Sequence, residues 1–416
     1  MSNLDPSRAW TNQAMEKLNA DSHRSADTHL IPVDIPGLPK ISFYMKDESV
    51  HPSGSLKHRL ARSLFLYAIV NGWVREGTTV IENSSGSTAV SEAYFARLLG
   101  LKFIAVVPLC TSPQKVQLIE RYHGEVHFVE NAGLCEAECM RLAAEGSNVH
   151  FMNQFAYAER ATDYRGNNNI AESLFAQMAR ETHPEPTFVV CGAGTGGTSA
   201  TLGRYVRYKG LNTSVVVADP DNSVFFDYFM SGDSSLKNCT PGKIEGIGRG
   251  RVEASFIRTI VDAMVHVPDA FSIGAVLFLE DYLGRRVGSS TGTIFCAALT
   301  MAFHMQADGK DGSIVSILCD GGDRYSSTIY SREWREGKGI EVAVQAAKAC
   351  ISAICCPGGG KFRSAEEAGR AGTGAEALPT PPCGFCPPPS PYAHLPGGSE
   401  DWPCVAQIRP RIPSHF

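Results

Sequence analysis

The 416-residue sequence lacks the features that mark several classes of protein. It has no basic excess, because the formal net charge is −5, and so no cationic surface for nucleic acid is expected. No apolar run reaches the roughly 20 residues that cross a bilayer, and the polar first thirty residues contain no apolar signal segment. We therefore expect a cytoplasmic protein that binds neither nucleic acid nor a membrane.

The sequence also lacks the spacing of a metal site, although it has 13 cysteines. Cys383 and Cys386 form a single CxxC pair, and zinc needs a second ligand pair that the sequence does not supply. The histidines show no ligand spacing either. In a reducing cytoplasm the cysteines are free thiols rather than a disulfide framework. No metal is expected.

The end of the chain lacks sustained hydrophobic periodicity. Of the 24 prolines, 12 fall within residues 357–416, together with many glycines. A segment of this composition cannot bury enough apolar surface to order itself. Residues 350–416 are therefore predicted to form a disordered tail.

What the rest of the chain does have is an alternation of short apolar runs with amphipathic stretches. Strands are expected at 41–45, 78–82, 103–108, 126–129, 187–191, 214–219 and 313–319, with helices between most of them. Such alternation is typical of parallel sheets covered by helices. The fold class is therefore α/β, and the chain is long enough for two domains.

The stretch from Lys46 to Arg59 joins a strand to a helix. Pro52 to Ser55 form a turn, and apolar residues at helical spacing follow it. Lys57 therefore sits in the first helical turn, where the helix dipole disfavours an ammonium group. The neutral amine is the form of lysine that makes Schiff bases. A surface lysine on an amphipathic helix is the alternative at this point.

A glycine-rich segment, Gly192 to Thr198, follows a predicted strand and opens a helix. Its backbone N–H groups can hold a phosphate at the helix N-terminus. The segment also satisfies the dinucleotide pattern G-x-G-x-x-G, and Asp219 ends the next strand. Taken alone, this pattern favours NAD, so an NAD- or nucleotide-binding protein is a second hypothesis.

Together the two segments resemble the fold-type II pyridoxal-phosphate (PLP) enzymes, which include cysteine synthases, cystathionine β-synthases and cysteine desulfhydrases. That family's lysine motif runs Lys-Asp/Glu-Glu, a gap, then Pro-Ser/Thr-Gly-Ser-x-Lys-x-Arg, and every position is filled here. The resemblance covers roughly residues 25–345. It implies that Lys57 carries PLP as an aldimine. It also implies a phosphate cup formed by Gly194, Thr195, Gly196, Gly197 and Thr198.

The same resemblance implies further contacts. Ser87 stands where the family has an asparagine that touches the PLP 3′-oxygen. In the segment that faces the pyridine nitrogen, Gly321 replaces the family's serine and Asp320 precedes it. Asp320, Gly321 or a water is then the partner of that nitrogen. The implied substrate-binding residues are Ser84, Ser85, Gly86, Thr88, Gln154 and Gly246.

The fold implied by the resemblance has two domains like the tryptophan synthase β subunit, each an open, twisted, mostly parallel sheet flanked by helices. A small mobile domain would comprise residues 58–160, and a large PLP-phosphate-binding domain would comprise 1–57 and 161–345. The cofactor would lie in the cleft between them. A homodimer is expected by the same resemblance.

Two details, Ser84 to Ser91 and Cys319 to Tyr325, look most like the cysteine desulfhydrase branch. That branch implies β-elimination on L-cysteine, which gives sulfide, pyruvate and ammonia through an aminoacrylate. Lys57 would remove the Cα proton. The alternatives are β-replacement, as in cysteine synthase or cystathionine β-synthase, and a non-catalytic relative with the same fold.

Overall fold

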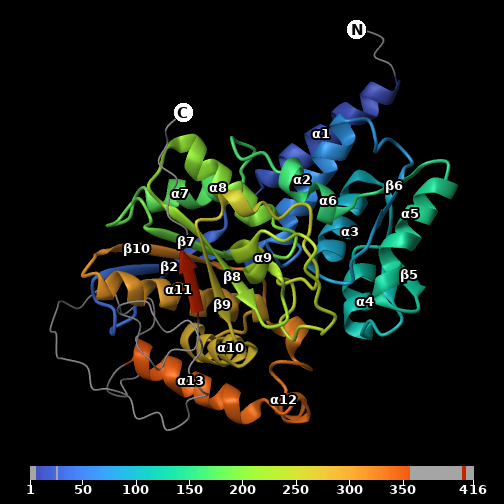
Figure 1. The fold of residues 1–416 in the computed structure, drawn as a ribbon. Coiled ribbons are helices and arrows are strands. Elements are labelled where there is room, and N and C mark those ends of the chain that lie inside the picture. The colour runs from blue at the N-terminus through green and yellow to red at the C-terminus, as the bar shows by residue number, and fades with distance from the viewer. Residues whose placement is uncertain (1–5, 25–26, 357–404, 409–416) are drawn as a thin grey trace.

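The structure is a computed structural model that describes residues 6–24, 27–356 and 405–408 (Figure 1). Its strands form two separate sheets. The strands of the larger sheet, in spatial order, are β1 (His29–Val33), β2 (Ile41–Asp47), β10 (Gly312–Leu318), β7 (Phe188–Gly192), β8 (Ser214–Pro220), β9 (Ala263–Val267) and β11 (Val405–Ile408). Those of the smaller sheet are β5 (Glu125–Val129), β4 (Lys102–Pro108), β3 (Thr79–Glu82) and β6 (Val149–Phe151).

All pairings in the four-stranded sheet are parallel. In the seven-stranded sheet only the two edge strands, β1 and β11, run antiparallel to their neighbours. The α/β class and the seven strands expected from the sequence are confirmed, each to within two residues at either end. The sequence pattern missed β1, β6, β9 and β11, of which β6 has only three residues.

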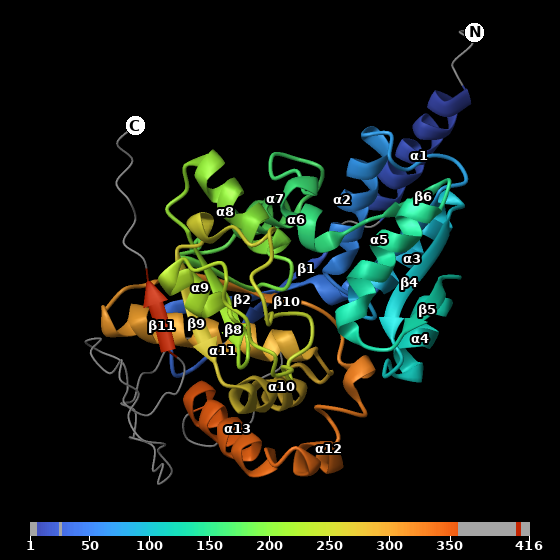
Figure 2. The same cartoon turned by 45° about the vertical axis from the view of Figure 1, so that its right-hand side comes forward.

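Helices cover both sheets, and Figure 2 shows the two units side by side. The helices of the first half of the chain are α1 (Pro6–Ser22), α2 (Lys57–Val70), α3 (Ser87–Leu99), α4 (Pro113–Glu120), α5 (Cys135–Glu145), α6 (Gln154–Ala161) and α7 (Ile170–Met178). Those of the second half are α8 (Gly197–Lys209), α9 (Phe225–Ser231), α10 (Asp269–Leu283), α11 (Ser289–Ala307), α12 (Arg332–Gly337) and α13 (Glu341–Cys355). None of the described helices is long and apolar enough to span a bilayer.

The core of the larger unit lies around β10 and α11. Every residue of β10 is buried, and α11 is buried along almost its whole length because strands lie on one side and α10 on the other. This explains why both segments read as continuous apolar runs rather than amphipathic ones. A second apolar cluster joins α2 and α3 to the smaller sheet.

That second cluster also contains Ala14 and Leu18 of α1, which are buried against α2 and α3. The sequence analysis placed residues 1–57 wholly with the larger sheet, and for α1 this differs from the structure. The reason is packing across the chain: the apolar positions of α1 meet α2 and α3, and sequence spacing alone does not reveal such a contact.

The predicted disordered tail is wrong in two places. Residues 350–355 complete α13, where Ile351 and Cys355 are buried, because this last turn continues the apolar stripe of the helix. Residues 405–408 form β11 along the free edge of β9. Residues 357–404 and 409–416, to which the rest of that prediction applies, lie outside the described residues.

Candidate active site

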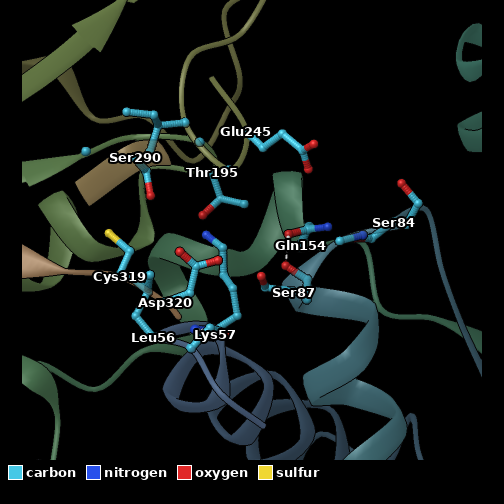
Figure 3. Close-up of a pocket in the computed structure, with 18 of the residues that line it drawn as sticks. Leu56, Lys57, Ser84, Ser87, Gln154, Thr195, Glu245, Ser290, Cys319 and Asp320 are labelled. Carbon is cyan, nitrogen blue, oxygen red and sulfur yellow. Dashed lines mark hydrogen bonds between the residues drawn. The ribbon is translucent and has the colours of Figure 1, made fainter. Parts of the chain in front are cut away.

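A cleft of about 560 Å³ lies between the two sheets. Its walls come from the segments that follow β3, β6, β7 and β10, together with the start of α2. Ligands of open α/β sheets bind where the carboxyl ends of the strands meet the following helices, and here two such edges face each other. Figure 3 shows Lys57 and Asp320 pointing into the same space, with Ser87 and Gln154 on the opposite wall.

Lys57 is the first residue of α2 and is held in place through its neighbours. The backbone N–H of Leu56 donates to the carbonyl of Cys319 at 2.8 Å, and this bond joins the turn to the end of β10. Although the residue is partly exposed to the cleft, the surrounding protein lowers the pKa of Lys57, with burial as the largest cause. Cys319 and Asp320 oppose that shift. The amine is therefore more readily neutral than that of a surface lysine.

The other charged residues of the Lys46–Arg59 stretch shape the turn. Arg59 Nε donates to Glu48 Oε2 at 2.6 Å, and Glu48 is fully buried. Lys46 is also fully buried, and its Nζ donates to the carbonyl of Thr28 at 3.0 Å. These buried, fully engaged charges resist movement of the turn that carries Lys57.

The glycine-rich segment forms the bend between β7 and α8. Gly196 has a φ of +85°, which favours glycine, and a Cβ there would lie 2.6 Å from the carbonyl oxygen of Ser255. A Cβ on Gly194 would lie 2.4 Å from the carbonyl oxygen of Gly246. Side chains are thus excluded at Gly194 and Gly196, and the start of a 13-residue helix borders the cleft. This arrangement fits a phosphate group. Residues of the predicted phosphate cup that line the cleft are Gly194, Thr195, Gly196 and Thr198.

Asp219, which made NAD a rival hypothesis, is outside the cleft lining. Its side chain is fully buried, and Oδ2 accepts a hydrogen bond from the backbone N–H of Phe226 at 2.9 Å. Burial raises the pKa of Asp219 to about 7. The carboxyl group therefore holds the start of α9 and does not face a ribose.

The predicted substrate loop follows β3 and leads into α3. Ser84, Ser85, Gly86, Ser87 and Thr88 all line the cleft, and so does Gln154 at the start of α6. Thr88 Oγ1 donates to Gln154 Oε1 at 2.8 Å, so the structure brings together two predicted substrate-binding residues that are 66 positions apart. Gly246 lies at the mouth, on the opposite side of the cleft.

Asp320 lies on the cleft wall and is almost fully buried. Its Oδ2 accepts from the hydroxyl of Tyr325 at 2.7 Å, whereas Oδ1 has no hydrogen-bond partner among the described residues. Burial raises the pKa of Asp320, and Arg324 opposes this shift. Gly321 is not among the residues that line the cleft. Two polar side chains that the sequence analysis missed, Ser290 and Cys319, line the same part of the wall.

Contacts across the cleft were also missed, because no local pattern encodes them. Arg324 Nη1 donates to Ser87 Oγ at 2.5 Å, which joins the segment after β10 to the start of α3. Two ion pairs also join the smaller unit to the loop before β9: Lys115 with Glu245 at 2.8 Å, and Glu136 with Arg251 at 2.8 Å. Within the described residues, no group of three or more metal-ligating side chains occurs.

Comparisons with known proteins agree with this geometry. A family model described as "Pyridoxal-phosphate dependent enzyme" matches residues 25–320. An L-cysteine desulfhydrase, Cds1, of Mycobacterium tuberculosis is 53% identical over 345 residues, which are 82% of this chain and 94% of that protein. Cysteine synthase 1 of Neurospora crassa is 30% identical over 313 residues, which are 72% of this chain and 79% of that protein. The crystal structure of an O-ureido-L-serine synthase superimposes with a TM-score of 0.64 at 25% identity and covers 72% of this chain and 91% of its own.

Proposed function

Because this chain belongs to the family of pyridoxal-phosphate dependent enzymes and therefore uses PLP, we propose that it removes the β-substituent of L-cysteine and releases sulfide, pyruvate and ammonia. The observation that carries this proposal is the 53% identity to an L-cysteine desulfhydrase over almost the whole of that protein. The cleft supports it with Lys57, a helix N-terminus preceded by two glycines that leave no room for side chains, and a polar loop on the facing wall.

We propose that the cofactor is held by Lys57 through its amine and by Gly194 to Thr198 through backbone N–H groups. Ser87 and Asp320 are the proposed neighbours of the pyridine ring. PLP supplies the electron sink that makes a Cα proton removable. Among the glycines of this segment, Gly196 is the least replaceable, because it combines a positive φ with a close approach to Ser255.

The chain's own groups then do three things. The loop Ser84 to Thr88 and Gln154 bind the substrate carboxylate and orient the Cα–H bond. Lys57 Nζ takes the Cα proton, a task for which its lowered pKa prepares it. Gly246 and its neighbours cover the mouth, assisted by the Lys115–Glu245 pair. As the Cβ–S bond breaks, its electron pair leaves with sulfur, and water hydrolyses the released aminoacrylate to pyruvate and ammonia. The reaction therefore needs one water and no oxidant or reductant.

β-Replacement is the second candidate, because a cysteine synthase is 30% identical over 72% of this chain. The two reactions share every step up to loss of the β-substituent and differ in whether a second nucleophile is captured. Ser87 has a shorter side chain than the asparagine expected there by resemblance, and its hydroxyl already accepts a hydrogen bond from Arg324. We infer that this wall holds the product of the first half-reaction loosely, which favours release over capture.

The test of this proposal uses the purified holoenzyme and L-cysteine as the only substrate. Sulfide and pyruvate should form in equal amounts, and D-cysteine should give neither. Absence of sulfide from a protein that retains its PLP absorbance would contradict the proposal. We further propose a cytoplasmic homodimer, which sedimentation equilibrium and cell fractionation would test.

A further inference from the structure

The substrate-side wall rests on a buried carboxylate that the sequence analysis did not single out. Glu82, the last residue of β3, has no exposed surface. Its Oε1 accepts from the backbone N–H of Asn83 at 2.7 Å, and its Oε2 accepts from the backbone N–H of Gln154 at 3.0 Å. One donor begins the loop and the other begins α6. Glu82 therefore ties together the two segments proposed to bind the substrate carboxylate.

Further hydrogen bonds connect the same segments around the carboxylate of Glu82. The side chain of Gln154 accepts from Thr88, while its backbone donates to Glu82, so loop, helix start and strand end hold one another. Thr88 and Gln154 line the cleft, whereas Glu82 lies behind them and outside its lining. Glu82 can thus orient groups that touch the substrate without touching the substrate itself.

A second buried carboxyl group lies one helical turn beyond Thr88. Glu92 of α3 has no exposed surface, and neither of its oxygens has a hydrogen-bond partner among the described residues. A buried, unpaired carboxylate is strongly unfavourable, so Glu92 is a neutral acid with an O–H group to donate. Burial is the larger cause that raises the pKa of Glu92, and the charge of Glu82 is the other.

Among the described residues, the other groups that act on Glu82 are acidic or neutral. Glu136 acts on it from α5, together with the buried thiol of Cys139, and Gln154 faces it from α6. Burial raises the pKa of Glu82 to about 7, although its bonds with Gln154 and Asn83 oppose the shift. Two carboxyl groups in such surroundings cannot both ionise without strong repulsion.

We propose that Glu82 positions the carboxylate-binding loop and Gln154, and that Glu92 stays protonated and leaves the negative charge to Glu82. This inference rests on the proposed function for the identity of the substrate as an amino acid. Glu82 accepts hydrogen bonds from the backbone N–H groups of Asn83 and Gln154, whereas Glu92 makes no hydrogen bond among the described residues. Glu82 thereby sets the affinity for the amino acid and takes no part in bond breaking.

The first test is Glu82→Gln in the holoenzyme. The amide keeps one oxygen and places an NH₂ group against one of the two backbone donors, so one hydrogen bond is lost. The probe is L-alanine, which has no β-substituent to lose, and its binding is followed by the change in PLP absorbance. Binding should weaken about tenfold, which corresponds to about 1.4 kcal/mol and to one hydrogen bond. The kcat for L-cysteine should change less than threefold, and the PLP content should not change.

The second test compares Glu92→Gln with Glu92→Leu. Neither variant breaks a hydrogen bond that Glu92 makes among the described residues, so both should bind L-alanine within about twofold of wild type. Asp219→Asn is the matched control, because Asp219 is also a fully buried carboxyl group with a raised pKa but lies in the other sheet. It should leave L-alanine binding unchanged.

Infrared spectroscopy provides a readout that does not depend on turnover. At pH 8 the wild-type protein should show a carboxylic-acid C=O band that Glu92→Gln removes and Asp219→Asn leaves in place. Failure to find that band, or wild-type affinity for L-alanine in Glu82→Gln, would overturn the proposal. If Glu82→Gln does not fold, the infrared band decides. A protein that binds L-alanine as expected but does not cleave L-cysteine would refute the proposed function alone.

Discussion

The wall of the cleft that belongs to the seven-stranded sheet, here called the backbone wall, contains a bend with no room for side chains at two positions, whereas the facing side-chain wall depends on hydrogen bonds between side chains. On the first, Gly194 and Gly196 leave no space for a Cβ atom at the start of α8. On the second, Thr88, Gln154 and Glu82 form a hydrogen-bonded circuit. The difference teaches that the cofactor side tolerates few substitutions for steric reasons, while the substrate side can be tuned through charge and hydrogen bonding.

The largest effect that would test this division is expected at Lys57, which stands between the walls. Lys57→Ala should reduce kcat for L-cysteine by roughly 10²–10⁴-fold or more, since it removes the general base as well as the attachment of PLP. Far-ultraviolet circular dichroism and the melting temperature should stay close to wild type. Lys310→Ala, at an exposed lysine, is the control. A Lys57→Ala protein with its visible absorbance band and full turnover would remove this residue from the mechanism.

The next largest effect is expected on the backbone wall. Gly196→Asp adds a side chain where φ is +85° and brings a negative charge to a helix N-terminus. PLP affinity should fall at least about tenfold, since the backbone strain and the unfavourable charge each contribute on the order of 1 kcal/mol. Equilibrium dialysis measures this.

Gly210→Asp is a matched control at the other end of the same helix. It has a φ of +67° and open space around it, so it introduces the backbone strain without the steric conflict or the nearby cleft. Equal loss of PLP from both variants would mean that strain in α8, and not the shape of the bend, explains the effect. If the wild-type protein binds NAD and Gly196→Asp binds it less tightly, this result would support the dinucleotide hypothesis.

Much of the backbone wall was predictable from the sequence, because its chemistry is local. The glycines, the helix start and Lys57 lie within two short segments, and excluded side chains leave a visible glycine pattern. The glycine pattern alone was ambiguous, because NAD sites use the same glycine-rich bend. The burial of Asp219 beside α9 argues against the NAD hypothesis and in favour of the PLP hypothesis.

The side-chain wall was predictable only where resemblance supplied it. Thr88 and Gln154 were expected to be substrate-binding residues, but their contact with each other was not foreseen. Glu82 ends a strand, where a carboxylate carries no periodic signal, and Glu92 looks like an ordinary polar position of an amphipathic helix. The proposed roles of Glu82 and Glu92 depend on their burial near α5 and α6, and the sequence alone does not reveal this packing.

A smaller effect is expected on the pH dependence of stability, through the buried carboxyl group of Asp219 in the larger sheet. The pKa of Asp219 is raised to about 7, so the native state favours its protonated form, and the associated stability is lost as pH rises from about 4 through 7. Asp219→Asn should remove that loss and stabilise the protein at pH 8 by a few kcal/mol at most, because each pKa unit is worth about 1.4 kcal/mol. At pH 4 the variant and wild type should unfold alike. Urea unfolding at both pH values measures the difference, and an equal shift at both would contradict the assignment.

The smallest effect on substrate binding is expected at the end of the chain. Truncation after Cys356 should change the melting temperature by only a few degrees, since it removes the β11 edge strand but leaves α13 whole. Truncation after Ala349 removes buried Ile351 and Cys355, and should destabilise the protein by roughly 2–5 kcal/mol. Neither should alter binding of L-alanine, because α13 packs on α10, away from the substrate wall. If the protein truncated after Cys356 does not fold, β11 is essential to the fold.

The most direct test of the account is the partition between elimination and replacement in one reaction mixture. Wild-type enzyme is given saturating L-cysteine with homocysteine as a second nucleophile, and separately O-acetylserine with sulfide; pyruvate and the replacement products are measured over the same interval. The account predicts that pyruvate matches the sulfide released from L-cysteine and exceeds cystathionine or newly formed cysteine. A replacement product that exceeds pyruvate severalfold at saturating nucleophile would contradict it, and the enzyme would then be a synthase with Lys57 in the same role.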